Sequence, residues 1–232
     1  MPTLFASKFQ RVSATLSDGT SFNDVRALSS GTQKGTITTS FNSVVQVIKD
    51  AGRGSGTFRI RRAFLTFDTS DINNNVSVAT LNLKVAFSNP DLEKIAIVRG
   101  TATGEDLDDF DAITGFNPNA SMTGNVTDLA NVPAHDFSTN SLNDDVAITL
   151  NSTARGLMTS ENTLTLVLVS HEYDYLRVEP SSNGFFDVGL YGITNTNTAL
   201  NVNISYTEII PPDPYIFMGN GKYTISSGKI SI

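Results

Sequence analysis

The chain has 232 residues, no cysteine, no tryptophan and two histidines, and its formal net charge is −7. The lack of cysteine excludes disulfides, thiolate zinc sites, iron–sulfur clusters and thiol nucleophiles, and two histidines leave little material for another metal site. Nucleic-acid binding needs a basic face, so the acidic balance predicts no nucleic-acid partner. The length fits one large domain, or one domain with an appendage.

The N-terminal segment has neither the basic region nor the apolar stretch of a signal peptide. Met1–Phe5 is followed by polar sequence through Gly19. Apolar runs such as Leu166–Val169 are far too short to cross a membrane. We therefore expect a protein that is made in a cytosol and has no membrane partner.

Apolar and polar residues alternate with a period of two along most of the chain, which is typical of half-buried strands. Gly, Asn and Asp residues separate these runs and favour turns. Many short strands with turns between them predict an all-β fold, an antiparallel β-sandwich or jelly roll over residues 1–209. The expected strands, in chain order, are 44–48, 58–67, 81–87, 95–97, 146–150, 164–168 and 202–206.

One short helical turn is expected at Thr153–Thr159, where Ala154, Leu157 and Met158 have helical spacing. We expect this turn to plug one end of the sandwich. Residues 103–143 are rich in Asp, Asn and Gly, and they predict extended loops with at most one short strand.

The composition changes near residue 210. Ile209–Pro214 contains three prolines and predicts a stiff, extended linker. Beyond it, 215–218, 222–225 and 229–232 predict three very short strands joined by tight turns, too few residues for a core of their own. Residues 210–232 are expected to form a β-arm that docks on a neighbouring subunit; a flap folded back on the same domain and a disordered tail are the alternatives.

Two loops share features with ligand-binding motifs. Gly52–Gly56 is glycine-rich, but it lacks the Lys-Ser/Thr of a phosphate loop and no helix follows it, so we expect a hairpin loop. Glu105–Asp111 carries five carboxylates, which could hold a calcium ion, but not at the spacing of a calcium loop. We expect a solvated acidic loop that Leu107 and Phe110 anchor to the core, with a bound cation as the alternative.

A catalytic centre is not expected. Ser170, His171 and Asp174 could be imagined as a nucleophilic triad, but neighbouring residues of a strand point to opposite faces, and no Gly-x-Ser-x-Gly elbow is present. His135-Asp136, in a predicted loop, has no better support. Since no pair among the 23 acids stands out as a glycosidase pair, we predict no catalytic, metal-binding or cofactor-binding residues and no cofactor.

Sugar binding without cleavage usually uses aromatic platforms, and tryptophan, the best of them, is absent. The Phe185-Phe186 pair more readily caps the core. The candidate platform residues are Tyr173, Tyr175, Phe185, Phe186 and Tyr191.

One stretch resembles a known family. Arg61–Ile72, followed by Val76–Leu83, is similar to the "R-x-F-L-x-F-D-x-S-x-I … I-x-x-A-x-L-x-L" signature of DNRLRE-type jelly-roll domains. The Ile95–Val98 strand and the closing V-N-I-S-Y-T strand at Val202–Thr207 follow in the order of that family, so the resemblance covers about residues 40–208. Such domains are similar to some carbohydrate-binding modules and recur in virion proteins of tailed bacteriophages.

The residues of the signature have structural roles. Phe64, Leu65 and Phe67 are expected to fill the space between the sheets. Asp68 is expected to close the next turn through side-chain-to-backbone hydrogen bonds. Arg62 is expected to pair with Asp68 or with an acid on the neighbouring strand.

The resemblance and the signal-free start together predict a non-enzymatic virion component, assembled in the host cytoplasm. It would be a capsid decoration or a head or tail appendage subunit, whose partners are other virion proteins, such as the major capsid protein, and further copies of itself. The alternative is a carbohydrate-binding host-attachment module that contacts a host surface glycan. A hydrolase of sugar polymers is the third hypothesis.

Overall fold

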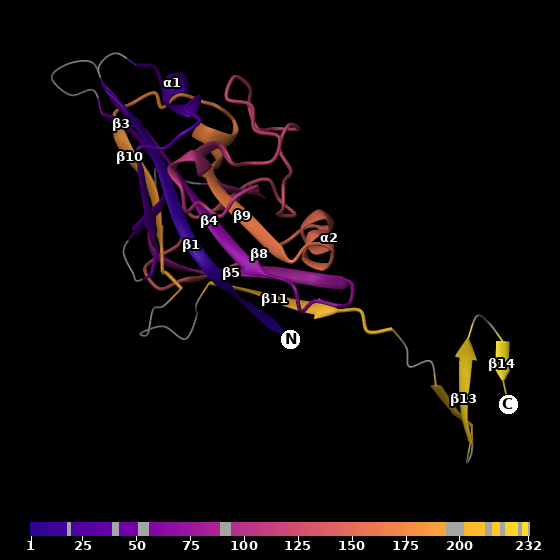
Figure 1. Cartoon of the computed structure of the whole chain (residues 1–232). Coiled ribbons are helices and arrows are strands. Elements are labelled where there is room, and N and C mark those ends of the chain that lie inside the picture. Colours follow the sequence, from indigo (N-terminus) through magenta and orange to yellow (C-terminus); the bar gives the residue numbers. More distant parts are fainter. Residues whose placement is uncertain are drawn as a thin grey trace.

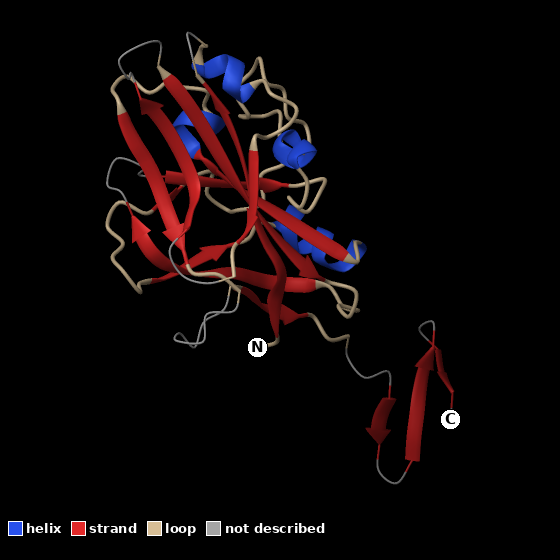
Figure 2. Ribbon diagram, turned by 60° about the vertical axis from the view of Figure 1, so that its left-hand side comes forward, coloured by secondary structure: helices blue, strands red, loops and turns tan. Residues whose placement is uncertain are grey.

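The computed structural model describes residues 1–17, 20–38, 42–50, 56–88, 94–193 and 202–211, and the backbone of 215–218, 221–226 and 229–231. Every strand pairing among these residues is antiparallel. The predicted all-β antiparallel sandwich is therefore confirmed (Figures 1 and 2). No helix in the described ranges is long and apolar enough to cross a membrane.

The strands are β1 (Thr3–Leu16), β2 (Gln33–Thr36), β3 (Asn42–Asp50), β4 (Thr57–Asp68), β5 (Val76–Ser88), β6 (Lys94–Arg99), β7 (His135–Asp136), β8 (Asp145–Thr149), β9 (Thr163–Ser170), β10 (Gly184–Leu190), β11 (Asn203–Glu208), β12 (Tyr215–Met218), β13 (Gly221–Ser226) and β14 (Lys229–Ser231). The helical elements are α1 (Phe22–Arg26), the 3₁₀ turn η1 (Leu107–Asp111), α2 (Ser152–Ser160) and the π-helical turn η2 (His171–Tyr175).

Two sheets make up the sandwich. The small sheet has the order β1–β11–β5–β8. In the large sheet β2, β1, β4, β3 and β10 are neighbours, and β9, β6 and β7 continue from the second half of β4. Both β1 and β5 bend from one sheet into the other, because the first residues of β1 pair with β11 and the last residues of β5 pair with β10. The pairings β1–β11–β5–β10–β3–β4–β1 thus form a closed circuit.

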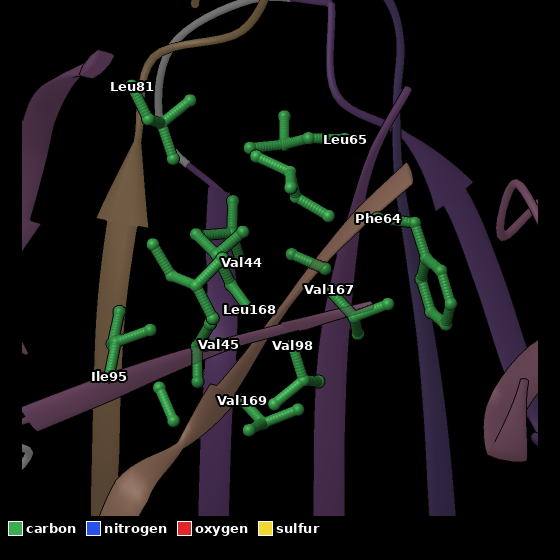
Figure 3. Packing of buried hydrophobic residues seen from close by; sticks show 14 of the residues in the cluster. Val44, Val45, Phe64, Leu65, Leu81, Ile95, Val98, Val167, Leu168 and Val169 are labelled. Atoms are coloured by element: carbon green, nitrogen blue, oxygen red, sulfur yellow. The ribbon is translucent and has the colours of Figure 1, made fainter. Parts of the chain in front are cut away.

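The core lies between the two sheets and continues beneath the loops that cover the outer side of the large sheet. Leu65, Leu81 and Leu168 are fully buried and come from β4, β5 and β9 (Figure 3). Phe64, next to Leu65, is also fully buried but points the other way, where its ring contacts the backbone at Gly104. The expectation that Phe64 fills the space between the sheets is therefore wrong: it packs beneath a loop.

All seven predicted strands are present, as β3, β4, β5, β6, β8, β9 and β11. Strands β1, β2 and β10 were not predicted. In β1 a bulge between Ala6 and Lys8 shifts the register against β4, and this shift breaks the alternation of apolar residues. In β10 both Phe185 and Phe186 are aromatic although only Phe186 is buried, so the pattern there is not a strict alternation.

The helical turn predicted at 153–159 is confirmed as α2, which buries Ala154 and Met158 against β5 and β9, one strand from each sheet. Helix α1 was missed, although Ser21 and Asp24 form a capping box at its start. Residues 103–143 are mostly loop, with η1 and the two-residue β7, as predicted. In the C-terminal segment the three predicted strands are present as β12–β14, which pair with one another (Figure 1); their docking partner stays a prediction.

Candidate functional site

The acidic loop Glu105–Asp111 is held by lysines. Lys8 of β1 pairs with Glu105, and Lys34 Nζ of β2 lies 3.1 Å from an Asp106 carboxylate oxygen. Hydrogen bonds from Lys8 and Thr103 lower the pKa of the Glu105 carboxyl. Phe110 is fully buried and anchors the loop as predicted, whereas Leu107 is half-buried. In the ranges that the structure covers, no group of three or more histidine or acidic side chains is arranged to hold a metal ion.

The imagined triad of Ser170, His171 and Asp174 does not form. Ser170 Oγ accepts a hydrogen bond from the backbone N–H of Tyr173, 3.3 Å away, at the start of η2. The His171 ring stacks on Tyr175 with the centroids 5.3 Å apart, and burial lowers the pKa of its imidazole. Asp174 points into the interior and is engaged by arginines. This segment is therefore a structural turn.

His135 and Asp136 also have structural surroundings. The His135 ring contacts Phe137 edge-on with the centroids 5.2 Å apart, and burial lowers the pKa of the imidazole. Asp136 Oδ1 accepts a hydrogen bond from the Ser138 backbone N–H at 2.8 Å. Of the glycine-rich loop 52–56, residues 52–55 lie outside the described residues.

A buried ion cluster joins three distant parts of the chain. Arg62 of β4 donates to both carboxylate oxygens of Asp174, at 2.7 and 2.9 Å, and Arg26 Nε of α1 lies 3.2 Å from the same carboxylate. All three side chains are at most 1 % exposed. The Arg62 guanidinium also lies over the rings of Phe110 and Phe116. The cluster therefore ties α1, β4 and η2 to the covering loops.

Arg62 was predicted to pair with Asp68 or with an acid on the neighbouring strand, and this prediction is wrong. Its partner is Asp174, which lies in the π-helical turn η2. Asp68 instead accepts hydrogen bonds from the Ser70 hydroxyl at 2.6 Å and the Ser70 backbone N–H at 3.0 Å. These bonds lower the pKa of the Asp68 carboxyl. The predicted role of Asp68 in closing the turn is confirmed.

A shallow groove of about 450 Å³ lies beside this turn. Its lining includes Lys8, Thr66 and Asp68. Cleavage of a glycosidic bond normally uses two facing carboxyl groups, and Asp68 is the one carboxylate among the described residues that line this groove.

Four of the five candidate sugar platforms are buried. Tyr173, Tyr175, Phe186 and Tyr191 are each at most 8 % exposed. Phe185, on β10, is 59 % exposed. A strip of stacked rings is therefore not available from this set, and Phe185 alone can meet a ligand.

The outer side of the small sheet carries ten neighbouring residues without charged side chains, which we call the uncharged face. Thr3, Ser205, Thr80 and Thr149 lie opposite one another in a row across four strands. Asn82 Nδ2 donates to Asn203 Oδ1 at 2.8 Å within the next row. The face consists of Thr3, Phe5, Val78, Thr80, Asn82, Ala147, Thr149, Asn203, Ser205 and Thr207.

Charged side chains border the uncharged face, in the Lys84–Asp145 pair and at Glu208. Two of its apolar side chains, Phe5 and Val78, are 58 % and 47 % exposed. The sequence signal for this face was the polar half of each alternating strand, which carries Thr, Asn and Ser where surface strands often carry Lys and Glu.

Three arginines gather on the large sheet, in a patch that we call the arginine face. Arg59 and Arg61 are two residues apart on β4 and so lie on one face of the sheet. Arg11 lies on the neighbouring strand β1, close enough to repel both. Burial and this repulsion lower the pKa of Arg61 to about 10, although Asp187 opposes the shift.

A row of opposed residues on three neighbouring strands lies within the arginine face. Gln46 lies opposite Arg61, and Asp187 lies opposite Gln46, in one row across β4, β3 and β10. Asp187 accepts hydrogen bonds from Gln46 Nε2 at 3.1 Å and from Ser43 Oγ at 2.6 Å. Arg61 is 8 % exposed, and within the part of the chain that the structure describes neither its Nε nor Gln46 Oε1 has a hydrogen-bond partner. Sequence reasoning did not predict this patch.

Comparison of the chain with protein-family models and with curated proteins found no match in either case.

Proposed function

We propose that this protein is a non-enzymatic structural component of a tailed-phage virion, a capsid decoration or a head or tail appendage subunit that acts by protein–protein assembly. The uncharged face is the observation that carries the proposal. Charged residues make up 17 % of the chain, yet none lies among the ten residues of this four-strand face. Depletion of charge is typical of the centre of a protein interface.

The composition of this face also suits assembly on energetic grounds. Thr, Ser, Asn and Ala lose little side-chain entropy when a partner covers them, in contrast to Lys and Glu. The exposed Phe5 and Val78 add apolar area that a partner would bury. The resemblance to DNRLRE-type domains of phage virions supports placing that partner on a particle.

Lysine substitutions on the uncharged face test the proposal. The double variant Ala147→Lys, Thr149→Lys changes two exposed side chains of β8, so it is expected to fold normally. We expect mass spectrometry of purified virions to detect the wild-type chain and to show that the double variant is depleted from them. Thr101→Lys, at an exposed site outside the face, is the matched control and should be incorporated normally. Absence of the wild-type chain from particles, or full incorporation of the double variant, contradicts the proposal.

The C-terminal strands test a second contact. A chain that ends at Ile209 retains both sheets of the sandwich, so its circular dichroism spectrum should match that of the full chain apart from β12–β14. We expect this truncated chain to fold and to lose assembly with its partner, by strand addition of the arm. If the truncated chain is incorporated as well as the full chain, the arm has no role in assembly.

The carbohydrate-binding alternative depends on Phe185, whose ring is exposed beside Asp187 and the arginines. It predicts retention on a glycan array that Phe185→Ala abolishes. Burial of the other four candidate rings favours the structural role, because sugar-binding faces normally present more than one aromatic platform.

A further inference from the structure

The arginine face is a local positive patch on a chain whose net charge is −7. Arg61 is buried in the sheet, and among the described residues neither its Nε nor the neighbouring Gln46 Oε1 has a hydrogen-bond partner. Arg11 and Arg59 repel the Arg61 guanidinium, and the nearby Asp187 carboxylate offsets part of this repulsion. Burying like charges at this spacing costs free energy unless an anionic partner meets them, so the patch is suited to receive carboxylates.

We infer that the arginine face binds the acidic loop Glu105–Asp111 of a second copy of this chain. The loop is the densest group of acids in the sequence, with five carboxylates in seven residues. Lys8 and Lys34 pair with Glu105 and Asp106, so the five carboxylates of the loop outnumber the lysines that pair with them, and Asp108 is exposed. The inference rests on the proposed function, because it specifies one contact through which an assembly subunit would associate.

The positions of the two patches allow this contact between copies. Arg62 and Val12 lie opposite each other on one side of the large sheet. The acidic loop covers that side, because the ring centroid of its Phe110 lies 4.2 Å from Cζ of the Arg62 guanidinium. Arg61 and Arg11 are the neighbours of these residues in the chain and so lie on the other side. The loop of one molecule therefore cannot reach its own arginine face across the sheet.

A contact between opposite sides of the same sheet is head-to-tail. Each copy would offer its arginine face to one neighbour and its acidic loop to another, so the association forms a ring or an open stack rather than a two-fold dimer. Asp187 argues against a uniform polyanion on this face, because its carboxylate would repel one. A short loop can place its carboxylates on the arginines and leave Asp187 with Gln46 and Ser43.

Sedimentation velocity of the full chain, and in parallel of the chain ending at Ile209, measures the mass of the associated species. Each chain is measured at about 50 mM and at about 500 mM salt, because screening of charges differs strongly between these concentrations. Arg11→Glu with Arg59→Glu reverses the half-buried part of the arginine face. Asp106→Lys with Asp108→Lys reverses exposed acids of the loop. We expect the wild-type chain to associate at low salt and to dissociate at high salt. In both double variants the affinity of association should fall by about tenfold or more per reversed charge.

Mixing the two double variants gives a sharper readout. Only the intact acidic loop of the first and the intact arginine face of the second can meet, so the mixture should form a one-to-one dimer and nothing larger. Asp71→Lys with Glu172→Lys raises the net charge by the same amount as the loop variant, at exposed sites outside both patches, and should associate like the wild type.

Three results would overturn the inference: a wild-type chain that stays monomeric at low salt, a mixture that forms no dimer, or equal weakening by the control variant. Retention of a monomeric chain on an immobilised polyuronate, abolished by Arg59→Glu, would assign the face to an acidic glycan instead. Any of these outcomes can occur while the chain is still incorporated into particles through the uncharged face, so failure of this contact and failure of the proposed function are distinguishable.

Discussion

Replacing Asp174 by asparagine should destabilise the fold strongly, because it removes the single negative charge between two buried guanidiniums. The Asp174, Arg26 and Arg62 side chains are each at most 1 % exposed, and the Asp174 carboxylate receives two hydrogen bonds from Arg62. Asparagine has the same shape, so the loss is chiefly one of charge. Breaking a buried pair in this way costs about 3–5 kcal/mol, a large part of the roughly 5–15 kcal/mol that stabilises a typical domain.

The assay is urea unfolding of the full chain followed by circular dichroism, since the chain has no tryptophan. Asp145→Asn is the matched control: it removes the charge from the Lys84–Asp145 pair, whose carboxylate side chain is 60 % exposed, and should cost less than about 1 kcal/mol. If Asp174→Asn costs no more than Asp145→Asn, the buried cluster does not hold the loops to the sheet.

Two further predictions concern single residues. Gly104→Ala should lower the free energy of unfolding by more than Gly124→Ala. Both glycines have positive φ (+77° and +71°), but an added Cβ at Gly104 would lie 2.6 Å from the Phe64 ring, whereas at Gly124 it would meet nothing within 4 Å. Urea unfolding should show a loss of about 1 kcal/mol for Gly124→Ala and a clearly larger loss for Gly104→Ala, and equal losses would contradict the packing at Phe64. Burial, reinforced by the hydrogen bond to Asp128, raises the pKa of Tyr175 to about 12. Because an unfolded tyrosine titrates at about 10, the stability that this shift contributes is complete below about pH 10 and is lost as the pH rises towards about 12. Tyr175→Phe should therefore flatten the fall in unfolding free energy over that pH range.

The strands of the sandwich were largely predictable, because burial on one side of a sheet imposes a period of two on the sequence. The prediction failed where that cause is absent. In β1 the bulge near Ser7 shifts the period within the strand. In β10 the exposed Phe185 stands beside the buried Phe186, and hydrophobicity alone does not separate them.

The candidate surfaces were much less predictable, because they depend on register between strands that are distant in the chain. Arg59 and Arg61 have the spacing of one face, but nothing local places Arg11 beside them. Arg62 was expected to pair close by, and its partner Asp174 lies 112 residues away. Such pairs follow from the topology of the sheets, which alternation of residues does not specify.

The closed circuit of strands has a consequence for synthesis. The first residues of β1 find their partners in β11, around residues 203–205, so the amino end of the chain has no complete set of hydrogen bonds until almost the whole sandwich has left the ribosome. The rest of β1 can pair earlier with β4, whereas the β1–β11 contact joins the residues of the circuit that lie farthest apart in the chain, and such long-range pairings form slowly. A nascent chain stalled before residue 203 would expose an unpaired strand edge, and a chaperone or another copy could bind there.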